Sequence, residues 1–165
     1  MRKFRVIKKH PMKVLFIQPN PIFGGAATAT ISVCKLLLER GADVIYSDEY
    51  DSNDKRLDVV VDHYPYHQNH FKSHAQIRNH ILSLKPDVVC WSSNIIPYFI
   101  HDIRLLQKQG VAHISLLHSL ALKKNLRGSL LDFLVAASLP YLNAIVFVSN
   151  YTLDSWNQYR SIIKS

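Results

Sequence analysis

The chain has 165 residues, of which 48% are hydrophobic and 19% charged, and this composition is typical of one globular domain and excludes a disordered chain. Its formal charge of +8 is concentrated in Met1–Pro11, where five Lys and Arg residues occur without an acid. Removing these five leaves 15 basic against 12 acidic residues, so the rest of the chain is only mildly basic. No apolar run reaches the roughly 18 residues that a membrane-spanning helix needs.

Two regions are expected: a flexible basic leader over residues 1–11 and a single domain over residues 12–165. The leader has no apolar segment of the kind found in secretory signals. It could contact acidic lipid or nucleic acid, or it could be a solvated tail that precedes a true start at Met12. Cys34 and Cys90 lie in apolar patterns and are expected to be buried thiols in a reducing compartment. We therefore expect a cytoplasmic protein that could be peripheral to the membrane.

The hydrophobic pattern predicts alternating strands and helices. Short apolar runs predict strands at Val14–Ile17, Val44–Tyr46, Leu57–Val61, Asp87–Trp91, Ala112–Leu117 and Ala144–Val148. Helical periodicity predicts helices from Gly24-Gly25 to a stop at Gly41, and over Phe71–Leu84, Pro97–Gln109, Ser129–Leu139 and Tyr151–Tyr159. His63–His70, which contains Pro65, is expected to be irregular, and Leu120–Arg127 to be a basic loop or partial turn. This alternation predicts an α/β fold: one Rossmann-like, doubly wound, mostly parallel sheet with helices on both faces.

Ligands of such folds bind outside the carboxyl ends of the strands. The residues predicted at those ends are mostly polar or glycine, unlike the helix faces. The candidate binding residues there are Gly24, Gly25, Ser92, Asn94, His118, Lys123, Lys124, Arg127, Ser149 and Thr152.

Gly24-Gly25 can expose backbone N–H groups at a helix N-terminus, which favours an anion such as phosphate or carboxylate. The alternative is a purely structural turn. The sequence has neither the G-x-G-x-x-G pattern of dinucleotide sites nor a P-loop. His118 ends an apolar strand and could act as a general base or donate to an anion, or be a hydrogen-bonded structural histidine.

Three cations follow His118 closely: Lys123, Lys124 and Arg127. They could hold a phosphate group or contact an acidic membrane surface, or they could belong to a solvated loop. A histidine cluster is also present, formed by His63, His67, His70, His74 and His80. Because no carboxylate or cysteine completes a zinc motif, we expect an aromatic, histidine-rich lip and no metal. Motifs for hydrolases and for nucleic-acid binding are missing, so no nucleic-acid partner is expected.

Several segments together resemble the N-terminal half of GT-B glycosyltransferases, in particular the retaining group called family 4. These enzymes begin with a strand, a Gly-Gly-Ala loop and a helix that closes in a sequence such as Arg-Gly-His-Glu-Val. Further along, the enzymes of this family have a Lys-Pro-Asp-Val-Val segment, a strand that ends in His, and a Val-Ser-x-x-Thr segment. The matching segments here are Lys13–Phe16, Gly24–Ala26, Arg40–Val44, Lys85–Val89, His118-Ser119 and Val148–Thr152.

The resemblance implies an acceptor-binding domain in which Gly24 and Gly25 approach the donor diphosphate or the acceptor. It places His118, as the catalytic residue, beside the transferring sugar, and Lys123, Lys124 and Arg127 near a phosphorylated or lipid-linked acceptor. Ala27 and Ser119 depart from the family pattern. The family's second domain, which binds most of the nucleotide-sugar, has no counterpart in this sequence. No cofactor is implied, because the nucleotide-sugar is a co-substrate of the complete enzyme.

The resulting hypothesis is the acceptor-side domain of a glycosyltransferase of polysaccharide biosynthesis, inactive alone, which transfers sugar to a glycan or lipid acceptor. Its partner would be a C-terminal donor domain, in cis or in trans. One alternative is the acceptor half of a split two-chain enzyme. Another is a non-catalytic flavodoxin-like binding module, although Gln18 and Asn20 stand where a receiver domain would carry acids.

Overall fold

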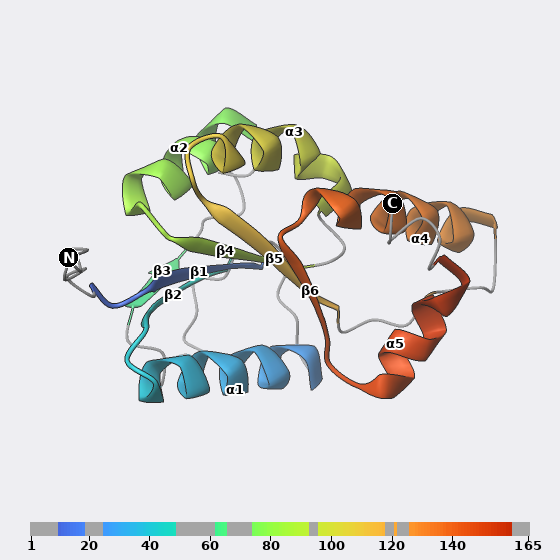
Figure 1. The fold of residues 1–165 in the computed structure, drawn as a ribbon, viewed down its shortest axis with the longest axis horizontal. Coiled ribbons are helices and arrows are strands. Elements are labelled where there is room, and N and C mark those ends of the chain that lie inside the picture. The colour runs from blue at the N-terminus through green and yellow to red at the C-terminus, as the bar shows by residue number, and fades with distance from the viewer. Residues whose placement is uncertain are drawn as a thin grey trace, which may run out of the picture.

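The computed structural model is an α/β domain in which helices pack against a central sheet (Figure 1). The structure describes residues 10–18, 25–48, 62–65, 74–92, 96–117, 121 and 126–159.

The sheet has six strands, all parallel to their neighbours, in the order β3-β2-β1-β4-β5-β6. The strands are β1 Lys13–Gln18, β2 Asp43–Asp48, β3 Asp62–Pro65, β4 Val88–Ser92, β5 Ala112–Leu117 and β6 Ala144–Phe147. The order reverses between β1 and β4, where Ile17 lies opposite Trp91. This is the Rossmann-like, doubly wound arrangement that the sequence predicts.

Helices cover both faces of the sheet: α1 lies on one face, and α2 and α3 lie on the other (Figure 1). Past β5, α4 and α5 lie toward the right of the same view, α4 beside α3. The helices are α1 Gly25–Glu39, α2 His74–Leu84, α3 Ile96–Gln107, α4 Leu126–Ser138 and α5 Asn150–Trp156, with 3₁₀ turns at Leu139–Tyr141 and Asn157–Tyr159.

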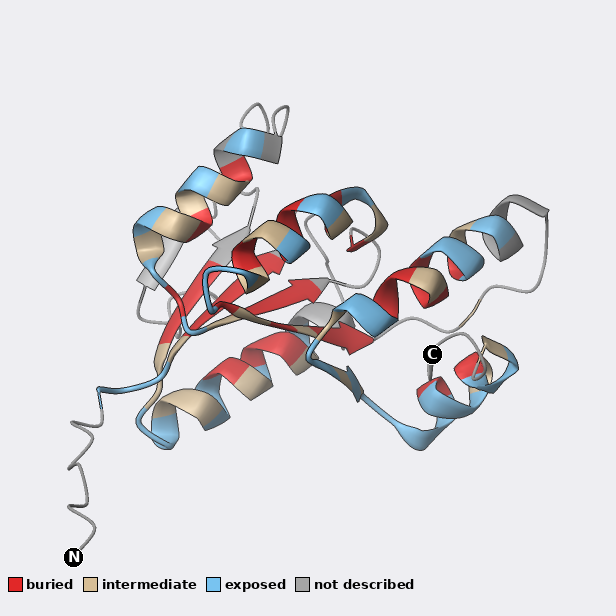
Figure 2. Ribbon diagram, turned by 45° about the horizontal axis from the view of Figure 1, so that its top comes forward, coloured by how far each residue is buried: buried red, intermediate tan, exposed pale blue. Residues whose placement is uncertain are grey.

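The alternation of side chains along the strands creates two apolar clusters, one on each face of the sheet. Val14 and Phe16 of β1 point to the cluster that includes Cys34 of α1, whereas Leu15 and Ile17 point to the larger cluster on the other face. Figure 2 shows the central strands as the most buried part of the fold. Strand β6 is an exception, because Ala144 and Val146 are exposed.

Two predicted boundaries are wrong. The third described strand is Asp62–Pro65, which overlaps the segment His63–His70 expected to be irregular, while Leu57–Val61 lies outside the described residues. Proline is tolerated here because β3 is an edge strand and Pro65 is its last residue. Helix α4 begins at Leu126, so Arg127 belongs to a helix and not to a basic loop. The glycine stop of α1 is confirmed, since Gly41 has a φ of 79°.

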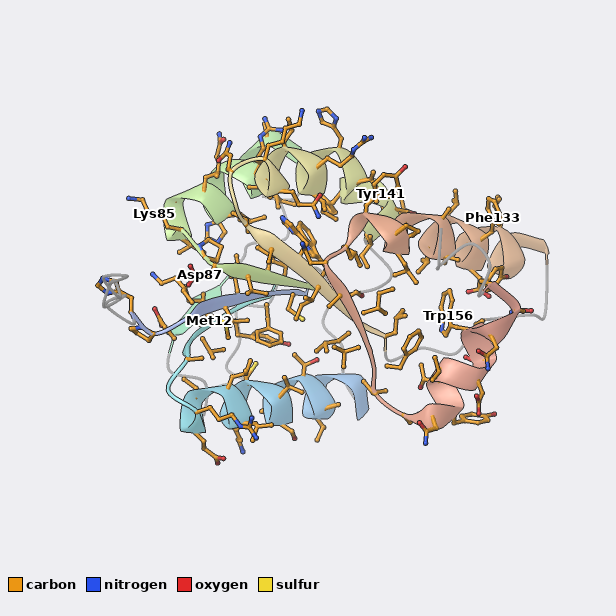
Figure 3. The ribbon with its side chains drawn as sticks, in the orientation of Figure 1. Met12, Lys85, Asp87, Phe133, Tyr141 and Trp156 are labelled. Carbon is orange, nitrogen blue, oxygen red and sulfur yellow. The ribbon has the colours of Figure 1, made fainter. Side chains whose placement is uncertain are left out.

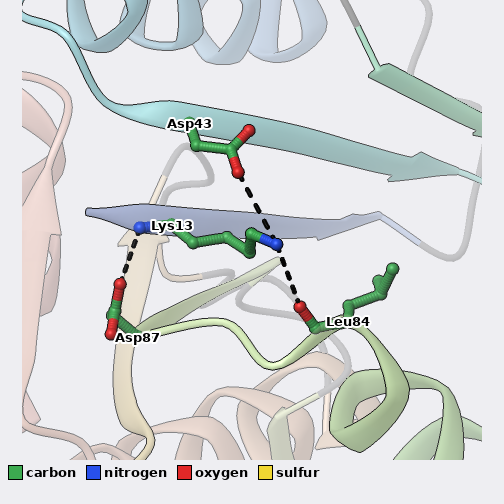
Figure 4. Close-up of polar contacts among 4 residues, drawn as sticks. All are labelled: Lys13, Asp43, Leu84 and Asp87. Atoms are coloured by element: carbon green, nitrogen blue, oxygen red, sulfur yellow. Dashed lines mark hydrogen bonds and ion pairs between the residues drawn. The ribbon is translucent and has the colours of Figure 1, made fainter. Parts of the chain in front are cut away.

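The amino ends of the strands are joined by a polar network around Lys13 (Figure 4). The Lys13 backbone N–H donates to Asp87 Oδ2 at 2.7 Å, and Lys13 Nζ donates to the Leu84 carbonyl at 3.3 Å. Lys13 Nζ also lies 3.6 Å from Asp43 Oδ2. The Lys85-Pro86-Asp87 segment therefore has a structural role, because Asp87 ties β4 to the start of β1.

Candidate functional site

The strand reversal places the candidate site at the carboxyl ends of β1 and β4. From β1 the chain passes to α1 on one face, and from β4 it passes to α3 on the other. Connections that leave in opposite directions open a crevice at such a reversal, and this is where doubly wound folds bind ligands. Gln18 and Ser92 are the last residues of these two strands.

Two predicted site residues belong to this edge by their backbone positions. Gly25 is the first residue of α1, so the N-terminus of a 15-residue helix follows the carboxyl end of β1. Ser92 ends β4. Gly24 and Asn94, which would complete the two loops, lie outside the described residues. The anion-binding role predicted for the Gly24-Gly25 turn stays a prediction.

Ser149 and Thr152 form the N-cap of α5, as the sequence predicts for Ser149. Ser149 has extended backbone angles (φ −158°, ψ 160°), and its side-chain oxygen accepts a hydrogen bond from the Thr152 backbone N–H at 3.1 Å. The two side-chain hydroxyls lie 3.0 Å apart. Thr152 is buried and Ser149 is exposed, so Ser149 is the residue of this pair that a ligand could reach.

His118, the predicted catalytic residue, follows directly after β5, which ends at Leu117. His118, Lys123 and Lys124 lie outside the described residues, and Arg127 is described only as the second residue of α4. Within the β5–α4 connection, the Ala121 backbone N–H donates to Ser155 Oγ of α5 at 3.2 Å. This bond holds Ala121 against α5.

Helix α4 carries a buried carboxylate that was not among the predicted site residues. Asp132 of α4 is 5% exposed. Burial, and secondarily the charge of Asp132, raise the pKa of the Tyr159 hydroxyl. Tyr159 in turn contacts the buried Trp156 ring, at 5.8 Å between ring centroids. A single acid within an apolar helical run was the available sequence signal, because such acids are rarely buried without a purpose.

The cysteines are buried thiols, as predicted. Burial raises the pKa of Cys34 to about 12 and also raises the pKa of Cys90, so neither thiol is a ready nucleophile. Among the described residues, no group of three His, Cys, Asp or Glu side chains could hold a metal ion. Of the histidine cluster, His67 and His70 lie outside the described residues.

None of the helices in the described part of the chain is long and apolar enough to cross a membrane.

The order of the parallel strands and the helices on both faces of the sheet define an α/β domain of the Rossmann-like class. The profile of a protein family described as Glycosyltransferase Family 4 matches residues 23–164, which is more than half of the chain. The chain belongs to this family. A search of curated proteins gave no match.

Proposed function

We propose that this chain is the acceptor-binding domain of a glycosyltransferase, which transfers a sugar from a nucleotide-sugar to a glycan or lipid acceptor in polysaccharide biosynthesis. The observation that carries the proposal is the reversal of strand order between β1 and β4 in a chain of Glycosyltransferase Family 4. Doubly wound folds bind ligands at such a reversal, and membership in this family makes glycosyl transfer the chemistry proposed there.

The proposed crevice is bounded by the N-terminus of α1 at Gly25, the end of β4 at Ser92 and the cap of α5 at Ser149. Hydroxyl and backbone N–H groups suit a sugar or phosphate, since both present oxygen atoms that accept hydrogen bonds. Asn94, Lys123, Lys124 and Arg127 are proposed to bind the acceptor or its phosphate. His118, which follows β5, is proposed to act beside the transferring sugar, where an imidazole can exchange a proton or donate to an anion.

The proposal assigns the nucleotide-sugar to a second domain, supplied in cis or by a separate chain. The domain alone is then expected to bind acceptor but to transfer no sugar. No cofactor other than this co-substrate is proposed. Copurification from the native host distinguishes the two arrangements, because a separate donor chain would be recovered with this one.

The proposal is tested by NMR titration of the isotope-labelled chain. The ligands are a panel of oligosaccharides and polyprenyl phosphates, followed by a uridine and a guanosine diphosphate sugar. Acceptor-induced shifts are expected at Ser92, Ser149 and Thr152, at the carboxyl ends of the strands. Residues at the amino ends, such as Lys13 and Asp87, serve as the internal control and should not shift. Nucleotide-sugars should bind with a dissociation constant of about 1 mM or weaker.

Shifts confined to the amino ends, or tight binding of a nucleotide-sugar without any acceptor binding, would contradict the proposal. Binding of neither class would favour the alternative of a non-catalytic module. In the complete enzyme, His118→Ala is expected to lower the transfer rate by roughly 100-fold or more. Full activity of that variant would remove the role proposed for His118 while leaving the acceptor site intact.

A further inference from the structure

Helix α4 is apolar on its outer face as well as on its inner face. Leu130, Phe133 and Leu134 are 60%, 48% and 44% exposed, and their spacing places them on one side of the helix. Tyr141, just past the helix end, is 40% exposed. Figure 3 shows Phe133 and Tyr141 on the outer side of this layer, away from Trp156. A helix that is apolar all round is ordinarily covered by another surface.

The neighbouring helix α3 adds positive charge to this apolar surface. Its exposed residues include His101 and Arg104, and the exposed Lys108 follows directly after its last residue, Gln107. The Arg104 guanidinium lies over the ring of Tyr141, in the 3₁₀ turn that follows α4, 5.2 Å from the centroid, so α3 contacts both α4 and this turn. We call the exposed side chains Arg104, Lys108, Leu130, Phe133, Leu134 and Tyr141 the α3–α4 face.

Exposed acids are missing from the described part of this face. Between residues 88 and 153 the chain has only two acids, Asp102 and Asp132, and these are 1% and 5% exposed. Asp102 is also ion-paired with Arg78 at 2.8 Å. The same stretch carries five Lys and Arg residues: Arg104, Lys108, Lys123, Lys124 and Arg127. Among its described residues, the α3–α4 face therefore combines apolar side chains with the cations Arg104 and Lys108 and has no exposed carboxylate.

We propose that the α3–α4 face docks on a membrane surface that contains anionic lipids. Leu130, Phe133 and Leu134 enter the boundary between headgroups and acyl chains, while Arg104 and Lys108 lie against lipid phosphates. Charge complementarity selects this occupant, because the anionic leaflet attracts cations and accepts apolar side chains together. A second copy packed on the same face would bring like charges together, since a two-fold contact pairs a patch with itself.

This inference goes beyond the proposed glycosyl transfer and does not depend on it. It is tested by sedimenting the full chain with vesicles of phosphatidylcholine alone, and with vesicles containing roughly one-third phosphatidylglycerol. The chain is expected to bind the anionic vesicles and to be released as salt is raised, because the lipid charge is screened. The double variant Phe133→Gln/Leu134→Gln should bind roughly tenfold more weakly or worse. Lys108→Glu should also weaken binding, and more strongly at low salt.

The matched control is Leu36→Gln. Leu36 is 48% exposed, like Phe133, but it lies on α1, across the sheet. Circular dichroism melts show whether each variant is folded. If the double variant unfolds, Lys108→Glu still tests the proposal, because its position is exposed and the substitution should not disturb folding. Failure of the chain to bind anionic vesicles would overturn the proposal, as would equal weakening by Leu36→Gln. If the chain dimerises without vesicles and Phe133→Gln/Leu134→Gln dissociates the dimer, the face binds a second copy and the membrane proposal is wrong. If the chain binds only an acidic protein, the face is a protein-binding surface.

Discussion

The two ends of the sheet use their polar residues differently. At the amino ends, the described polar groups bond mainly to one another: Lys13 to Asp87 and Asp43, and the His113 backbone N–H to Asn143 Oδ1 at 2.8 Å. At the carboxyl ends, the described polar residues sit at element termini, where Ser92 ends β4 and Ser149 caps α5. The difference teaches that the Lys85-Pro86-Asp87 motif maintains the fold, whereas the opposite end is the place to look for a ligand.

The largest effect is expected from His113, near the amino end of β5. Its Nδ1 accepts a hydrogen bond from Trp91 Nε1 at 2.7 Å, and burial lowers the pKa of His113 from 6.5 to about 4. As the pH falls from about 6.5 to about 4, His113 binds a proton in the unfolded chain but stays neutral in the folded protein. The free energy of unfolding should therefore fall over this window, by up to about 3 kcal/mol.

Denaturant unfolding at several pH values measures this effect. His113→Gln keeps an acceptor for Trp91 but cannot titrate, so its stability should vary less between pH 6.5 and pH 4. A variant with the same pH dependence as the wild type would show that His113 is not responsible. His80, whose pKa is also lowered by burial, would then be the next candidate.

Asp87→Ala is expected to lower the free energy of unfolding by about 1 kcal/mol, because the Lys13 N–H loses a charged acceptor at an exposed position. Urea unfolding measures the change. The ligand-induced NMR shifts at the carboxyl ends should be retained. If those shifts disappear while the variant remains folded, the separation of the two ends is wrong.

Ser149→Ala tests the other end of the sheet. Loss of the α5 cap should cost about 1 kcal/mol of stability, and Ser149→Asp should recover most of it, because a carboxylate also caps a helix. If Ser149 also contacts the acceptor, acceptor affinity will fall in the alanine variant by more than its small loss of folded population explains. Unchanged affinity would limit Ser149 to its structural role.

The smallest effect, in the opposite direction, is expected at Lys85. This residue has a φ of 50°, a conformation that side chains other than glycine adopt at a cost. Lys85→Gly should raise the thermal midpoint slightly, by an amount equivalent to about 0.5–1 kcal/mol. A lower midpoint would mean that contacts of the Lys85 side chain outweigh its backbone strain. Gly41→Ala, at a φ of 79°, is the reverse control and should destabilise the protein.

Residues whose structure follows from local chemistry were predicted well. Apolar runs correctly predicted the central strands, Gly41 predicted the end of α1, and Ser149 predicted the start of α5. The errors arose where position in the fold overrides local preference. Pro65 is accepted because β3 is at the edge of the sheet, and Gly128 is accepted within the first turn of α4.

Of the candidate site, the sequence selected the strand ends but not Asp132, because an acid in an apolar helix could equally have faced solvent. Only packing against the core shows that it is buried.

The sequence by itself determined the alternating elements, the parallel α/β class and the buried cysteines, since these depend on side-chain periodicity over a few residues. The tertiary structure decided which strands are neighbours, because Lys13 and Asp87 are 74 positions apart and their pairing has no local signal. It also decided that one apolar side of α4 remains exposed. Periodicity shows that a helix has two apolar sides, but only the positions of the surrounding elements show which side is covered.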